Sequence, residues 1–139
     1  MNSAIKSIID LSSKMRKVIL EMSLNCGQSA HIGGGLSIVD ILASLYEGVG
    51  GFSINKLDNR FILSKGHGVL GLLSVLHCKN FISKDDILTF QTNGSEFIAH
   101  PIANHSLGIE SSNGSLGQGL SFGIGIALSY KKKNNNGNI

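Results

Sequence analysis

The chain has 139 residues, of which 42% are hydrophobic and 15% are charged, and its formal net charge is +3 at neutral pH. This length suits one domain of ordinary size. Part of the charge lies in the lysines at 131–133, and it is too small and too local to indicate nucleic-acid binding. No apolar run approaches the ~20 residues of a membrane span. A typical soluble protein is about a quarter charged, so we expect another chain or further sequence to cover part of this surface.

The cysteines and the N-terminus both indicate a cytoplasmic protein. Cys26 and Cys78 form neither a CxxC pair nor a zinc-binding spacing, so we interpret them as reduced core thiols. The N-terminus lacks the apolar segment of a secretory signal, because charged residues are scattered through positions 6–17.

The first third of the chain predicts two helices around a glycine run. Apolar residues at helical spacing predict an amphipathic helix over residues 3–25. Three consecutive glycines at 33–35 then predict a flexible or tightly turned loop instead of regular structure. A second helix is predicted over 38–46, and Ser37 and Asp40 stand at the spacing of a capping box.

The middle of the chain contains the clearest strand signal. The apolar run at 60–64 has the composition of a buried parallel strand, and it ends at a glycine-rich loop around His67. A helix is predicted over 69–81. Ser83 marks the start of another helix, which should run to about Gln91.

A long segment without periodicity, residues 92–113, separates these helices from the last one. Loops of this length tend to be functional or disordered. The stretch 110–130 opens with glycine and small polar residues and continues as an apolar helix to about Lys133. Such a turn brings backbone N–H groups and the positive end of a helix dipole close to a ligand. An ordinary loop followed by a close-packed buried helix explains the same glycines.

These elements predict the fold class. One strand at 60–64, with a second one beginning at 138–139, cannot make a sheet. A buried-type strand followed by a loop and a helix belongs in a parallel α/β sheet. We therefore expect the front portion of an α/β domain, mostly helical as it stands, with one or two short strands.

The five histidines fall into two groups. His31, His67 and His100 lie in loops beside small residues, where an imidazole can reach a ligand and titrate near neutral pH. Taken singly, each is more often structural than catalytic. His77 lies on a predicted helix and should be hydrogen-bonded at the edge of the core, whereas His105 should be a solvated loop residue. Because no HxxxH or HxH pair exists, the spacing predicts no histidine metal site.

Five motifs, taken together and in order, resemble the start of transketolase, and most closely the N-terminal subunit of transketolases that are split over two chains. The similarity runs from about residue 15 to residue 133, and five motifs in order are far more specific than any one of them. They are SAHIGGGLS at 29–37, DILASLY at 40–46, RFILSKGHG at 60–68, AHP at 99–101 and GIESSNGSLGQGLS at 108–121.

The resemblance implies a cytoplasmic enzyme of carbohydrate metabolism, in the pentose phosphate pathway, that uses thiamine diphosphate and Mg²⁺. Such an enzyme moves a two-carbon ketol unit between sugar phosphates. Residues 1–139 would form a single partial domain, the front part of the diphosphate-binding domain. The implied partners are sugar phosphate substrates and a C-terminal transketolase subunit or remaining chain, in a dimer or higher assembly.

The resemblance also implies roles for single residues. His67 matches the histidine that contacts the cofactor diphosphate. His31 and His100 match histidines that hydrogen-bond substrate hydroxyls and assist proton transfer, an effect typically worth ~10²–10⁴-fold in rate. The turn before the last helix matches the segment that contacts the aminopyrimidine ring; its residues are Gly114, Ser115 and Leu116.

The sequence departs from the family pattern at several places. Ala30 and Ala99 stand where the family usually has glycine, and Asn113 stands where it usually has threonine. The Gly-Asp-Gly segment that holds the metal in the family has no counterpart up to Ile139, so we expect the metal ligands to lie outside this chain. Two alternatives stay open: a non-enzymatic remnant or interaction module that pairs with a complete relative, and a thiamine enzyme resembling deoxyxylulose-phosphate synthase.

Overall fold

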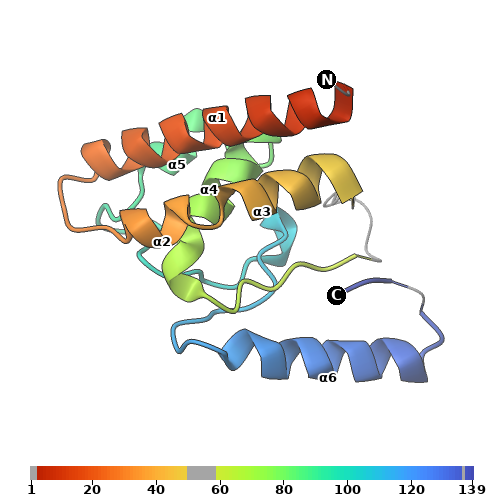
Figure 1. The fold of residues 1–139 in the computed structure, drawn as a ribbon. Coiled ribbons are helices and arrows are strands. Elements are labelled where there is room, and N and C mark those ends of the chain that lie inside the picture. The colour runs from red at the N-terminus through yellow and green to blue at the C-terminus, as the bar shows by residue number, and fades with distance from the viewer. Residues whose placement is uncertain (1–2, 50–58, 136) are drawn as a thin grey trace.

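The structure is a computed structural model that describes residues 3–49, 59–135 and 137–139. Within this part of the chain there is no strand, although Asn104 and Ile109 form an isolated antiparallel bridge. Figure 1 shows a body built from α1 to α5, with α6 lying along one side of it. In chain order the elements are α1 (Ser3–Asn25), α2 (Ile32–Leu36), α3 (Val39–Ala43), the π-helix η1 (Ser44–Val49), the 3-10 helix η2 (Gly66–Gly68), α4 (Val69–Cys78), α5 (Lys84–Leu88), the 3-10 helix η3 (His105–Leu107) and α6 (Gln118–Lys132).

Helix α4 is the centre of the core. Its residues from Val69 to Leu76 are all buried, and a helix that is apolar on every side is stable only inside a protein. It contacts α1, α2, α3 and α5, and Figure 1 shows it between α1 and α3. The helix ends earlier than predicted because Asn80 adopts a φ of 62° and Phe81 N–H donates to the carbonyl of Leu76 at 2.8 Å. A left-handed residue with this hydrogen bond is a common helix terminator.

Helix α1 confirms the prediction made from apolar spacing. Its buried side chains recur every three or four residues and face α3 and α4. Burying a side chain of this size contributes about 1.5–3 kcal/mol. The apolar members of this buried face are Leu11, Met15, Val18, Ile19 and Met22.

The loop predicted for the glycine run is wrong, because Gly33 to Gly35 lie inside α2. A Cβ on Gly34 would collide with the carbonyl oxygen of His67, and one on Gly35 would lie 2.8 Å from the Cβ of Leu70. The missing side chains therefore allow α2 to pack directly on η2 and α4. This packing offsets a helix-propensity cost of up to about 1 kcal/mol per glycine.

The helix starts predicted at Ser37 and Ser83 have different outcomes. No side chain caps α3, and the hydroxyl of Ser37 donates instead to the carbonyl of Gly34 at 2.9 Å. Ser83 does cap α5, because its Oγ accepts the N–H of Asp86 at 3.0 Å. Helix α5 then ends at Leu88, which is earlier than predicted.

The residues predicted as strands lie side by side without forming regular strands. In the segment 60–64, the N–H of Arg60 donates to the carbonyl of Asn138 at 2.8 Å. This bond joins the two segments in which strands were predicted. A strand ladder needs a series of such bonds, so neither segment is a strand within the described chain.

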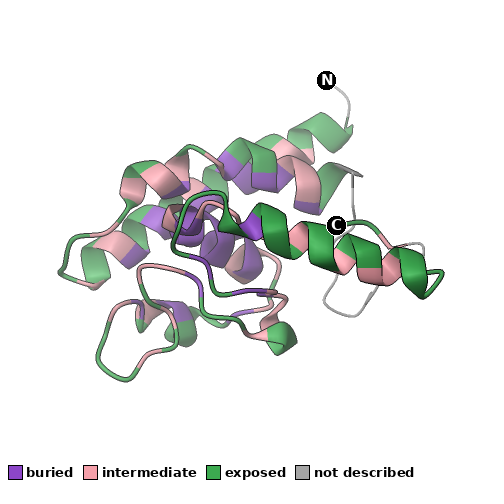
Figure 2. Cartoon of the chain, turned by 90° about the horizontal axis from the view of Figure 1, so that it is seen from below, coloured by how far each residue is buried: buried purple, intermediate pink, exposed green. Residues whose placement is uncertain are grey.

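Helix α6 confirms the last predicted helix, but it is not a buried one. Of its described residues Gly119 alone is buried, and Figure 2 shows α6 as a mostly exposed helix, whereas most of the buried residues lie in the body beside it. Among the described helices, none is both long enough and apolar enough to cross a membrane. The large apolar side chains at 44% to 70% exposure on or next to α6 are Leu116, Leu120, Phe122, Ile124 and Leu128.

Candidate functional site

Three segments meet at the turn η2, and glycines allow the close approach. A Cβ on Gly66 would collide with the backbone carbonyl of Asn113 and would lie 3.2 Å from Cδ2 of His100. On the other side of the turn, Gly34 of α2 packs against the carbonyl of His67. The loops that carry the predicted site residues are therefore held against a single turn of backbone.

This convergence brings the three loop histidines together. The ring centroid of His67 lies 4.6 Å from those of His31 and of His100, and the ring centroids of His31 and His100 are 5.3 Å apart. One nitrogen from each ring can be chosen so that all three lie within 4.8 Å of one another. His31 is exposed, whereas His67 and His100 are half-buried, so the cluster opens to solvent on the side of His31.

The cluster has two electrostatic features that suit a ligand. Partial burial, and then the nearby imidazoles of His67 and His31, lower the pKa of His100, so its ring is neutral at pH 7. Nδ1 of His67 is buried and has no hydrogen-bond partner within the described residues. Leaving such an atom unsatisfied costs about 1–3 kcal/mol, which a ligand at this position would recover.

Lys65 is a residue to which the sequence analysis gave no role. Its Nζ donates to Oγ of Ser37 at 2.6 Å and lies 3.4 Å from the carbonyl oxygen of Gly34. It therefore joins the η2 turn to the end of α2 and places a positive charge near the histidines. Its position two residues before His67 in the Lys-Gly-His motif is the signal that would have identified it.

Asn113 connects the glycine-rich turn to the site. Its Nδ2 donates to the carbonyl of Leu63 at 3.1 Å and to Oγ of Ser111 at 2.6 Å, while its buried Oδ1 has no partner in the described chain. The predicted aminopyrimidine-contacting residues follow Asn113 directly, and all three are exposed. Asn113 therefore holds the start of this turn beside Gly66. The rest of the turn is exposed to solvent; it consists of Gly114, Ser115 and Leu116.

The N-terminus of α6 follows this turn. Gly117 precedes the helix with a φ of 89°, and no side chain caps the first turn. The N–H groups of Gln118 and Leu120 donate to the carbonyls of Ser115 and Gly117 at 3.3 Å and 3.1 Å, so the backbone already satisfies part of this start. The positive end of the helix dipole still favours an anion at this position.

The remaining two histidines, His77 and His105, lie outside the cluster. Nδ1 of His77 donates to the carbonyl of Ile82 at 2.9 Å, which confirms a structural role at the edge of the core. His105 is 71% exposed, and its Nδ1 lies 3.5 Å from a carboxylate oxygen of Glu110. The same oxygen accepts from Nη1 of Arg60 at 2.5 Å, and Nε of Arg60 donates to the hydroxyl of Tyr130 at 2.8 Å.

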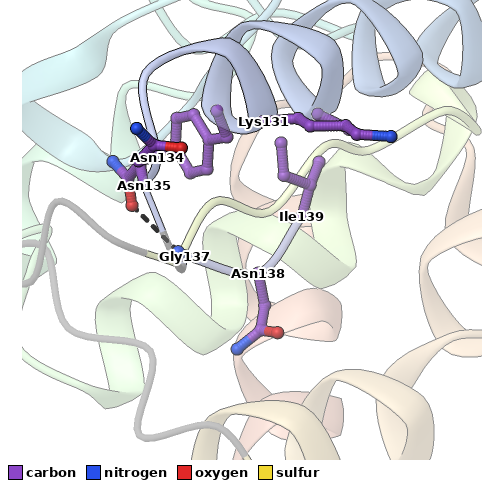
Figure 3. A pocket seen from close by; sticks show the side chains of 8 residues that line it. Lys131, Asn134, Asn135, Gly137, Asn138 and Ile139 are labelled. Atoms are coloured by element: carbon purple, nitrogen blue, oxygen red, sulfur yellow. Dashed lines mark hydrogen bonds between the residues drawn. The ribbon is translucent and has the colours of Figure 1, made fainter.

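A recess of about 510 Å³ lies at the other end of α6, away from the cluster. Figure 3 shows it between the last turns of the helix and the tail that folds back beside it. Its lining consists of amide groups, apolar side chains, a tyrosine and one lysine, none of which has a predicted role. The lining residues are Ala127, Tyr130, Lys131, Asn134, Asn135, Gly137, Asn138 and Ile139.

Comparison with known proteins identifies the family. Residues 11–138 match the family model described as "Transketolase, thiamine diphosphate binding domain". The chain belongs to the transketolase family. The match covers most of the chain, so it confirms the resemblance that the five motifs carried.

Two relatives are similar to this transketolase chain over most of its length. An apulose-4-phosphate transketolase subunit of Actinobacillus succinogenes is 34% identical over 122 residues, which are 85% of this chain and 44% of the relative. A 6-deoxy-6-sulfo-D-fructose transketolase subunit of a Clostridium species is 35% identical over 126 residues, which are 84% of this chain and 44% of the relative. The chain spans less than half the length of these curated relatives.

A solved structure confirms the fold class. Transketolase from Leishmania mexicana superposes with a TM-score of 0.79 at 27% identity, covering 88% of this chain and 19% of that one. The helical body is therefore a portion of a transketolase α/β domain. Within the described residues no strand lies beside the segment 60–64, and its bond to Asn138 is not enough for a ladder.

Proposed function

We propose that this chain is part of a thiamine-diphosphate-dependent transketolase that transfers a two-carbon ketol unit between sugar phosphates. The observation that carries the proposal is the convergence of His31, His67 and His100 on one turn, in a chain whose family domain binds thiamine diphosphate. Residues 1–139 then form the front part of the diphosphate-binding domain.

The groups around η2 fit a diphosphate. Nδ1 of His67 is buried without a partner in the described chain, the first turn of α6 has no side-chain cap, and the ammonium of Lys65 is nearby. Each of these favours a ligand with negative charge. We assign the diphosphate contact to His67 and the aminopyrimidine contacts to Gly114, Ser115 and Leu116. When bound, thiamine diphosphate supplies the carbanion chemistry, and the protein supplies position and electrostatics.

His31 and His100 are assigned to the sugar phosphate. His31 is exposed at the mouth of the cluster, where it can hydrogen-bond a substrate hydroxyl. The lowered pKa of His100 leaves a neutral imidazole, which can accept a proton and return it.

A complete site needs groups from outside this chain. Among the described residues no carboxylate joins the histidine cluster, and a divalent ion such as Mg²⁺ needs oxygen ligands. We therefore propose that Mg²⁺ is held by a segment of a C-terminal subunit or remaining chain, in a cytoplasmic dimer or higher assembly. Two relatives are named as transketolase subunits, which indicates that those enzymes consist of more than one kind of chain.

The test is calorimetric titration of the 139-residue chain with thiamine diphosphate and Mg²⁺, with and without a chain that supplies the missing segments. We expect tight cofactor binding and ketol transfer only in the presence of the second chain. Micromolar binding by the lone chain would show that the anchoring site is complete within these residues.

Single replacements in the assembled protein test the assignments. His67→Ala should weaken cofactor binding, whereas His31→Ala and His100→Ala should lower kcat or raise KM by about 10²-fold or more. His77→Ala is the control, because its ring bonds to the backbone outside the cluster. Ketol transfer that is lost in the control at unchanged stability, and kept in the other three variants, would refute the assignments.

A further inference from the structure

The histidine cluster also has the geometry of a transition-metal site. We propose that His31, His67 and His100 bind one divalent late transition metal, zinc in particular, through one ring nitrogen each, and leave the fourth coordination position open. This site is distinct from the Mg²⁺ site of the proposed function, which needs oxygen ligands from another segment.

The positions of the ring nitrogens support the proposal. Three of them, one from each residue, lie within 4.8 Å of one another. A tetrahedral zinc ion with Zn–N bonds of about 2.0–2.1 Å needs ligand nitrogens roughly 3.3 Å apart. The nitrogens must therefore approach one another by up to about 1.5 Å, and we expect side-chain rotation to bring them together, with the exposed His31 the freest of the three rings to turn.

The chemistry of the ligands selects the class of metal. Imidazole nitrogens suit zinc, copper and nickel, whereas Mg²⁺ and Ca²⁺ require carboxylate, carbonyl or water oxygens. No carboxylate joins this cluster within the part of the chain that the structure describes. Three histidines with one open position, facing solvent beside His31, are the ligand set of a zinc site that also takes water or an anion.

The fold holds the ligands close before any metal arrives. Gly34 packs against the carbonyl of His67, and Gly66 packs against the ring of His100, so two glycine contacts fix the spacing of the three loops. HxxxH and HxH spacings place both ligands on one element, whereas each of these three histidines comes from a different element of the fold. Nδ1 of His67 has no hydrogen-bond partner in the described chain, and coordination would satisfy a nitrogen of that ring.

Zinc would exclude the ligands of the proposed function, because all three rings would be occupied. This consequence rests on the proposed function, but zinc binding itself does not. Loss of zinc binding with intact cofactor binding in the assembled protein would reject the metal site alone. A chain that binds zinc but, once freed of zinc and assembled with the missing segments, shows neither cofactor binding nor ketol transfer would reject the proposed function alone.

The experiment is calorimetric titration of the 139-residue chain with zinc sulfate. We expect one zinc per chain, with affinity reduced by about 10–100-fold or more in His31→Ala, His67→Ala and His100→Ala, since even an outer-shell partner is typically worth that much. His105→Ala is the matched control, because this histidine is exposed and lies outside the cluster. A double replacement of Cys26 and Cys78 by serine removes the thiols as competing ligands and should leave zinc binding unchanged.

Titration with Co²⁺ gives a second readout. Cobalt in a tetrahedral nitrogen site shows visible absorption without a thiolate charge-transfer band, and His31→Ala should abolish it while circular dichroism stays unchanged. The exposed position of His31 makes this variant decisive even where His67→Ala affects folding. Zinc affinity that persists in all three histidine variants, or that disappears in the double serine variant, would overturn the proposal.

Discussion

Helices α4 and α6 are both rich in leucine, isoleucine or valine, yet their surroundings are opposite. Every residue of α4 from Val69 to Leu76 is buried, whereas Gly119 is the buried residue of α6. The difference lies in their neighbours, because α4 contacts four other helices, whereas α6 lies against the segment 60–64 and the C-terminal tail. Apolar composition therefore determines which residues need burial, and the surrounding elements determine which of them obtain it.

The candidate site likewise has one part on the buried body and another part at the start of α6. The three histidines are positioned by α2, η2 and loops that pack on the buried body. Gly114, Ser115 and Leu116 lie where the chain passes from Asn113 to α6. The histidines are thus positioned by the packed body, whereas the position of residues 114–116 depends on the packing of the start of α6 against Ser64.

Core truncation should show the largest effect. Leu73 is 1% exposed in α4 and Leu128 is 55% exposed in α6. We expect Leu73→Ala to lower the free energy of unfolding by about 2–5 kcal/mol, and Leu128→Ala to change it by about 0.5 kcal/mol or less. Urea denaturation of both variants makes the measurement. Equal losses in the two variants would mean that α6 is packed as tightly as α4.

Gly119 and Gly125 lie in the same helix, α6, but in different surroundings. A Cβ on Gly119 would lie 2.5 Å from Cα of Ser64, whereas one on Gly125 would meet open space. Gly119→Ala should therefore destabilise the chain by about 1–3 kcal/mol through overpacking, and Gly125→Ala should stabilise it by up to about 1 kcal/mol. Hydrogen exchange of α6 amides, together with thermal unfolding, distinguishes the two. Faster exchange in Gly125→Ala than in Gly119→Ala would contradict the packing.

Helix capping offers a smaller test of the same contrast. Ser83 caps α5 through the N–H of Asp86, whereas Ser121 lies exposed inside α6. Ser83→Ala should cost about 0.5–2 kcal/mol of stability, and Ser121→Ala should cost nothing measurable because alanine is the better helix former. The free energies of unfolding of the two variants check this. If Ser83→Ala is neutral, solvent replaces the cap and α5 contributes little to the body.

The smallest expected effect is a pH dependence at the surface of the body. A hydrogen bond from Arg16 at 2.7 Å is the main cause that lowers the pKa of Asp40 below its ordinary value. The pKa of the Asp40 carboxyl is therefore lower in the folded chain than in the unfolded chain, where it is about 3.9. The pair stabilises the fold at pH values above about 3.9, and this stabilisation is lost as the pH falls through the folded pKa of Asp40. Both side chains are exposed, so the contribution is about a few tenths of a kcal/mol. The difference in stability between Asp40→Asn and the parent chain should vanish in acid; a constant difference at every pH would exclude this origin.

The sequence predicted most of what depends on local pattern. The spacing of Met15, Ile19 and Met22 predicted α1, and five short motifs predicted the family and the fold class. Sequence reasoning failed where packing decides the outcome. Gly34 lies in a helix that packs against His67, and residues 60–64 form no strand because, within the described chain, a bond to Asn138 does not make a ladder. The meeting of three histidines from separate loops is likewise a property of the folded chain, which no spacing rule detects.

The Arg60 side chain has a mechanical consequence. Gly119 touches Ser64 at one end of the 60–64 segment, and Tyr130 bonds to Arg60 at its other end. From Gly119 to Tyr130 the helix rises about 16 Å, while the chain from Arg60 to Ser64 reaches at most about 14 Å. The segment therefore runs antiparallel to α6 and is held to the helix near both of its ends. If the N-terminus of α6 tilts away from Ser64, the hydrogen bond between Arg60 and Tyr130 still holds the C-terminal end of the helix to the same segment.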